Sequence, residues 1–141
     1  MESRIEKAVE LFKSGYNCAQ AVFVTYADLY DIDKETALKL SSSFGGGIGG
    51  MREVCGAVCG MCMIVGLESG MTIAKDSKQK QENYALVQEL AEKFRKENGS
   101  ILCKQLLGLE PGIDAGKKKK PCVEYVRYCA ELIEQMRPVS H

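Results

Sequence analysis

The chain has 141 residues, of which 45% are hydrophobic, and this is enough for one domain with a buried core. Nineteen Lys and Arg residues balance nineteen Asp and Glu residues, so no surplus of positive charge is available to bind nucleic acid or an anionic membrane. We therefore expect a single domain over residues 1–141 that binds neither nucleic acid nor a membrane.

The first thirty residues predict two helices separated by a short turn. Ser3 and Glu6 have the spacing of a capping box, and the helical apolar pattern that follows them ends near Gly15. Asn17 and Gln20 repeat the same start signal ahead of a second apolar stripe. The second helix is therefore expected to begin almost immediately after the first one ends.

A glycine-rich loop separates the next two predicted helices. Asp33 is placed to cap a third helix. The stretch FGGGIGG that follows interrupts every regular pattern. Residues 54–70 then have the pattern of a central apolar helix that carries Cys55, Cys59 and Cys62 on one face.

The second half of the chain predicts three further helices and one loop. Residues 76–98 have the pattern of a long amphipathic helix on the outside of the molecule, and Ser100 can cap a short helix over residues 100–107. Residues 108–120 are rich in glycine and lysine and indicate a loop, after which Pro121 suits the first position of a last helix. Because no alternating strand pattern occurs, we predict an all-α fold, a single-domain bundle of about six to seven helices.

The cysteines and the histidine limit the chemistry. The N-terminal residues carry scattered charges where a signal peptide has an unbroken apolar stretch, so we expect a cytoplasmic protein. In a reducing compartment, seven cysteines are expected to be metal ligands, redox thiols or core residues rather than structural disulfides. The one histidine is the last residue, His141, and this excludes mechanisms that need a buried imidazole.

Four cysteines stand at predicted helix N-termini. The unpaired N–H groups and partial positive charge of a helix N-terminus favour a thiolate, so we expect lowered pKa values at these positions and convergence on one site. The other three lie inside predicted helices, where cysteine usually behaves as a small buried hydrophobe. The N-terminal set is Cys18, Cys55, Cys103 and Cys122, and the internal set is Cys59, Cys62 and Cys129.

The same positions carry a resemblance to a known family. The segments YNCAQA around Cys18, FGGG, and CGAVCG from Cys55, followed by Cys103 ahead of Leu-Leu-Gly and by Cys122, resemble the C_GCAxxG_C_C family of redox-active proteins. The order Cys-Gly-Ala differs slightly from the order written in the family's name. The resemblance covers nearly the whole chain and implies a helical, redox-active protein whose four characteristic cysteines are these four.

An iron–sulfur cluster is the first use we predict for four such cysteines. Four thiolates can hold a [2Fe-2S] or [4Fe-4S] centre, and glycines allow the backbone to approach it closely. The protein would then transfer electrons to or from an unknown redox partner protein. The expected close-approach glycines are Gly45, Gly46, Gly47 and Gly56, and Cys59 or Cys62 is an expected substitute ligand.

Three alternatives stay open. The same cysteines can act as a thiol-disulfide oxidoreductase without any metal, so an enzymatic activity is neither required nor excluded. They can bind zinc, although the wide spacing differs from the usual close Cys-x-x-Cys pairs. They can instead be core residues of a non-enzymatic helical module that binds a partner or a second copy, so a homodimer is also open.

Overall fold

The described residues form an all-α bundle, as the sequence predicted. A computed structural model describes residues 2–110 and 119–137. These residues form seven α-helices and one short 3-10 helix, and they contain no sheet; Val54 and Leu102 form an isolated antiparallel bridge. The helices are α1 (Ile5–Lys13), α2 (Cys18–Ala27), α3 (Lys34–Ser42), α4 (Gly56–Ser69), α5 (Ser77–Asn98), α6 (Cys103–Leu106) and α7 (Cys122–Met136), and the 3-10 helix η1 (Asp28–Tyr30) follows α2.

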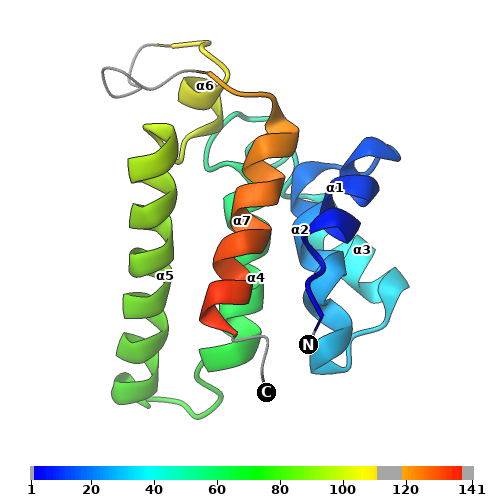
Figure 1. Ribbon diagram of the computed structural model, residues 1–141. Helices are drawn as coiled ribbons and strands as arrows, with labels where there is room; N and C mark the ends of the chain where they lie inside the picture. The colour runs from blue at the N-terminus through cyan, green and yellow to red at the C-terminus, as the bar shows by residue number, and fades with distance from the viewer. Residues whose placement is uncertain (1, 111–118, 138–141) are drawn as a thin grey trace.

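Helices α2 and α4 form the centre of the bundle. Helix α2 packs against α1, α3, α4 and α7, and eight of its residues are buried. Gly60 allows the close approach of α4, because a Cβ atom there would lie 2.8 Å from the carbonyl oxygen of Ala19. Figure 1 shows α5 on one side of the α4–α7 pair and α1 to α3 on the other, which confirms α5 as an outer helix.

Three helix starts agree with the prediction, and two of them, at Asn17 and Asp33, agree with a predicted cap. The Asn17 side chain accepts a hydrogen bond from the Gln20 N–H, and the Gln20 side chain accepts one from the Asn17 N–H, which completes the capping box of α2. Asp33 and Asp76 cap α3 and α5 through their side-chain oxygens. Gly99, in the left-handed conformation with φ of 92°, ends α5.

Two predicted caps were wrong. Arg4, not Ser3, is the N-cap of α1, and its N–H donates to the Glu134 carboxylate of α7 over 2.7 Å. Ser100 does not cap α6, which begins only at Cys103, because the bridge with Val54 holds Leu102 in an extended conformation. In both places, an interaction with a residue distant in the sequence determines where the helix begins, and the local capping residue does not.

Two further observations concern the last third of the chain and the membrane. Pro121 is the N-cap of α7 rather than its first helical residue. Of the predicted loop 108–120, residues 111–118 lie outside the described residues. No helix in residues 2–110 or 119–137 combines the length and the apolar character needed to cross a membrane.

Candidate functional site: a cavity lined by four cysteines

The four cysteines at helix N-termini line one cavity. Cys18, Cys103 and Cys122 are the first residues of α2, α6 and α7, and Cys55 is the N-cap of α4. The cavity has a volume of about 180 Å³, and its wall is mostly apolar. Figure 1 shows α6 and the first turn of α7 at the same end of the bundle. The other lining residues are Phe12, Asn17, Gly46, Arg52, Gly56, Leu106, Leu107 and Tyr125.

Backbone pairing between two loops places Cys55 beside Cys103. The Cys55 N–H donates to the carbonyl of Ile101 over 2.8 Å, and the Cys103 N–H donates to the carbonyl of Glu53 over 2.6 Å. These bonds flank the isolated bridge between Val54 and Leu102. Residues nearly fifty positions apart in the sequence are thereby held at neighbouring points of the cavity wall.

The glycine loop fits closely around this pair of cysteines. Gly46 and Gly47 have φ values of 62° and 70°, which residues with a side chain rarely adopt. A Cβ atom on Gly47 would lie 2.7 Å from the Cys103 Cβ, and one on Gly45 would lie 2.5 Å from side-chain atoms of Asn17. Gly46 itself lines the cavity, whereas Gly45 and Gly47 support residues that do.

The missing side chain of Gly56 likewise allows Cys18 to approach closely. A Cβ atom on Gly56 would lie 2.5 Å from the Cys18 sulfur and 2.8 Å from the carbonyl oxygen of Phe44. The first residue of α4 therefore has to be glycine for the start of α2 and the end of α3 to approach it. Three of the four cysteines thus contact or adjoin a glycine of the predicted set.

Burial reverses the predicted direction of the pKa shift at Cys18, Cys55 and Cys122. Burial raises the pKa of Cys18, and hydrogen bonds from the Gly46 and Ala19 N–H groups lower it by a smaller amount. Burial also raises the pKa of Cys55 and, at the cavity mouth, that of Cys122. The helix N-termini do supply N–H groups to sulfur, but the apolar surroundings outweigh them, so these thiols are neutral at pH 7 without a bound cation.

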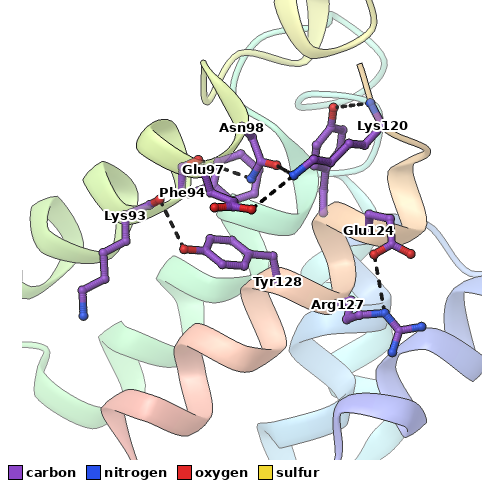
Figure 2. A network of polar contacts seen from close by, with 9 residues as sticks. Lys93, Phe94, Glu97, Asn98, Lys120, Glu124, Arg127 and Tyr128 are labelled. Carbon is purple, nitrogen blue, oxygen red and sulfur yellow. Dashed lines mark hydrogen bonds and ion pairs between the residues drawn. The ribbon is translucent and has the colours of Figure 1, made fainter. Parts of the chain in front are cut away.

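The start of α7 is tied to the end of α5 by a polar network (Figure 2). The Lys120 ammonium donates to the buried Asn98 side chain over 2.9 Å and also lies 3.5 Å from Glu97. The Lys120 N–H donates to the Tyr125 hydroxyl over 3.2 Å, and Tyr125 lines the cavity. These bonds fix Lys120 two residues before Cys122 and so position that cysteine.

The remaining cysteines do not line this cavity. Cys59 and Cys62 lie on α4 beyond Cys55, and burial raises the pKa of each to about 11. Cys129 is fully buried in α7. The prediction of these three as internal helical residues is confirmed, and the structure gives Cys59 and Cys62 no place in the cavity wall as substitute ligands.

Arg52 was not singled out by the sequence, although it lies in the cavity wall. Its guanidinium Nη1 lies 3.7 Å from the Cys103 sulfur. The one available signal was a cation placed between the glycine loop and Cys55. Asn17 and Tyr125 also line the cavity. Asn17 caps α2 as well. Tyr125 lies on a helix face, where an aromatic residue is equally typical of the core.

All seven cysteines are free thiols in this structure. Among the described residues, no group of three or more His, Cys, Asp or Glu side chains is placed around a single point to hold one metal ion. The described residues therefore show no preformed site for a single metal ion.

Comparisons with known proteins support the resemblance seen in the sequence. The family model "Putative redox-active protein (C_GCAxxG_C_C)" matches residues 16–136, which include all four cavity cysteines. A protein of Archaeoglobus fulgidus, described as an uncharacterized protein, is 28% identical over 141 residues, which cover 93% of this chain and 91% of that protein. No solved structure matches the chain.

Proposed function

Because the chain belongs to the C_GCAxxG_C_C family of redox-active proteins, we propose that its four-cysteine cavity binds an iron–sulfur cluster and that the protein transfers electrons. The observation that carries this proposal is the gathering of Cys18, Cys55, Cys103 and Cys122 in the wall of one cavity from four separate helix starts. Four thiolates are the usual ligand set of both common cluster types. When bound, the cluster would supply the one-electron chemistry.

The donor set and its surroundings fit such a group. In a [4Fe-4S] centre each iron takes one protein thiolate, so four ligands are needed but no three of them converge on one ion. This is compatible with the described residues, which show no site for a single metal ion. The missing side chains of Gly47 and Gly56 let Cys103 and Cys18 lie directly against the backbone, because a Cβ atom there would come within 2.7 Å of the Cys103 Cβ and 2.5 Å of the Cys18 sulfur.

The residues of the chain have three tasks in this proposal. The four cysteine sulfurs would be the ligands, and at Cys18, Cys55 and Cys122 the positive iron would offset the burial that raises the thiol pKa. The Gly46 and Ala19 N–H groups donate to the Cys18 sulfur. Apolar residues such as Leu106 and Phe12 exclude water from part of the cavity.

Iron and sulfide content of anaerobically purified protein tests the proposal. We expect stoichiometric iron and visible charge-transfer absorption in the wild type, and loss of both in Cys55→Ser. Cys59→Ser and Cys62→Ser are matched controls, because they make the same change on the same helix outside the cavity. Iron-free, colourless wild-type protein would overturn the cluster proposal.

Thiol-disulfide exchange at the same residues is the second candidate. Cys18, Cys55 and Cys103 line the same cavity, and a thiolate at Cys18 or Cys103 would add to the burial that raises the pKa of Cys55. Two cysteines would form an S–S bond while a disulfide of the partner is reduced to two thiols, which balances two electrons and two protons. The raised pKa of Cys18 places this second, since the thiolate is the attacking form.

Mass spectrometry separates the two candidates. Trapping the protein with an alkylating agent across a range of redox potentials would reveal an intramolecular disulfide as a loss of two mass units and two alkylation sites. Exchange chemistry requires that disulfide to include one of the cavity cysteines. Full alkylation at every potential would eliminate this second candidate.

A further inference from the structure

Arg52 contributes the one charged side chain among the described residues that line the four-cysteine cavity. Its Nη1 lies 3.7 Å from the Cys103 sulfur. Within residues 2–110 and 119–137, no carboxylate forms an ion pair with this guanidinium. In the described part of the chain, its positive charge is therefore directed at the cavity sulfur and is not neutralised by an acidic neighbour.

The backbone fixes the position from which this side chain extends. The Arg52 N–H donates to the Gly46 carbonyl over 3.0 Å, and the Arg52 carbonyl accepts from the Lys104 N–H over 3.1 Å. Arg52 has a φ of 62°, an uncommon value for a residue with a side chain. A Cβ atom on Gly46 would lie 3.5 Å from the Arg52 Nη1, so the guanidinium lies next to the glycine loop.

The sign of the electrostatic effect follows from charge. A cluster with four thiolate ligands carries net negative charge, and this charge grows by one when the cluster is reduced. A fixed cation close to a ligand sulfur stabilises the more negative form most; Arg52 is exposed, so solvent screening reduces the size of this effect but leaves its sign unchanged. The cation therefore favours reduction.

On the basis of the function proposed above, we infer that Arg52 is a positioning residue that raises the reduction potential of the four-cysteine site through its contact with the Cys103 sulfur. It acts on the ligand and is not itself a ligand. The N-termini of α2, α4 and α7 add partial positive charge of the same sign, and Lys119 adds a charge near Cys122 from outside the cavity wall. Arg52 supplies the full charge within the wall.

Redox titration of three variants tests this inference. In Arg52→Gln, we expect iron content equal to that of the wild type and a lower midpoint potential. In Arg52→Lys, the charge is kept, so the potential should return most of the way to the wild-type value. The control is Lys104→Gln, which removes a neighbouring cation that pairs with Glu53 at 3.7 Å and lies outside the cavity wall; its potential should stay close to that of the wild type.

The outcomes distinguish this inference from the function on which it rests. If wild-type protein holds no iron, the cluster proposal fails, and the role of Arg52 fails with it. If wild-type and Arg52→Gln proteins hold equal iron at equal potential, only the role of Arg52 is wrong. If Arg52→Gln holds no iron, restoration of iron in Arg52→Lys would support the need for a positive charge, and its absence there would overturn the inference.

Discussion

At the scale of single residues, Gly56 controls how closely α2 and α4 approach at the cavity. Its missing side chain leaves room for the Cys18 sulfur and the Phe44 carbonyl, which a Cβ atom would meet at 2.5 and 2.8 Å. Because a backbone carbonyl cannot move cheaply, we expect Gly56→Ala to destabilise the metal-free protein by about 1–3 kcal/mol. Urea unfolding followed by circular dichroism measures this change.

Gly66 is the matched control for this substitution. It lies on the same helix, is exposed, and would place its Cβ atom with nothing within 4 Å. Alanine favours helix over glycine, so Gly66→Ala should stabilise the protein by about 0.5–1 kcal/mol. Equal effects of the two substitutions would contradict the packing argument.

Cys59 and Cys62 make the stability of the reduced, metal-free protein depend on pH. Burial raises the pKa of both thiols to about 11 in the folded state, whereas an unfolded cysteine ionises at about 8.5. Between these values the unfolded state binds fewer protons, so the free energy of unfolding falls as pH rises. The contribution is complete below about pH 8.5 and is progressively lost up to about pH 11.

A double variant isolates this contribution. Cys59→Ala with Cys62→Ala lowers stability at every pH through lost packing, but its stability should fall less steeply than that of the wild type between pH 9 and 11. Lys and Tyr residues titrate in both proteins and cancel in the comparison. Urea denaturation in reductant gives both curves, and parallel curves would show that the two thiols are not buried as described.

At the scale of helices, Asn17 links a helix cap to the cavity. Its side chain accepts from the Gln20 N–H and donates to the Ser42 carbonyl over 3.0 Å, and it packs against Gly45. Asn17→Ala should remove about 1 kcal/mol of stability through the lost cap. It should also lower iron content, because the start of α2 carries Cys18 and the same side chain holds the glycine loop.

Asp33 provides the comparison for this effect. It caps α3 through the same kind of bond, to the Thr36 N–H, and does not line the cavity. Asp33→Ala should cost a similar stability and leave iron content unchanged. Thermal melts and iron assays on both variants measure the two quantities separately, and an equal loss of iron in both would deny Asn17 a role at the site.

Helix starts were predictable wherever the signal was local. The reciprocal bonds of Asn17 and Gln20 lie within one turn, and sequence spacing alone identifies such a pair. The start of α1 was not predictable, because the Arg4 N–H is satisfied by Glu134, a residue 130 positions away. Ser100 failed for a similar reason, since the pairing of Leu102 with Val54 delays α6 until Cys103.

At the scale of the whole molecule, the sequence predicted which cysteines come together but not the apolar surroundings in which they lie. Helix N-termini and the family resemblance selected Cys18, Cys55, Cys103 and Cys122, and the fold brings these four together. The direction of their pKa values was wrong where it is resolved, because desolvation depends on neighbours such as Leu106 that no local pattern identifies. Arg52 was missed because its approach requires left-handed backbone and backbone hydrogen bonds with Gly46 and with Lys104 of α6.

Because the cavity gathers cysteines from positions 18 to 122, binding of the proposed cluster should stabilise the fold as a whole. A group held by the folded state alone raises the free energy of unfolding, and for a chain of this size each 1 kcal/mol raises Tm by about 4 °C. Anaerobically reconstituted wild type should therefore melt several degrees above the metal-free protein. Scanning calorimetry of both forms measures the difference.

The pattern of variants decides whether this gain comes from the cavity. Cys122→Ser removes one of the proposed ligands from the cavity wall, so its reconstituted and metal-free forms should melt at the same temperature. Cys62→Ser changes a cysteine outside the cavity and should keep the wild-type difference, although both of its forms melt lower. A gain that survives in Cys122→Ser but disappears in Cys62→Ser would place the stabilising group on the α4 cysteines beyond Cys55 instead.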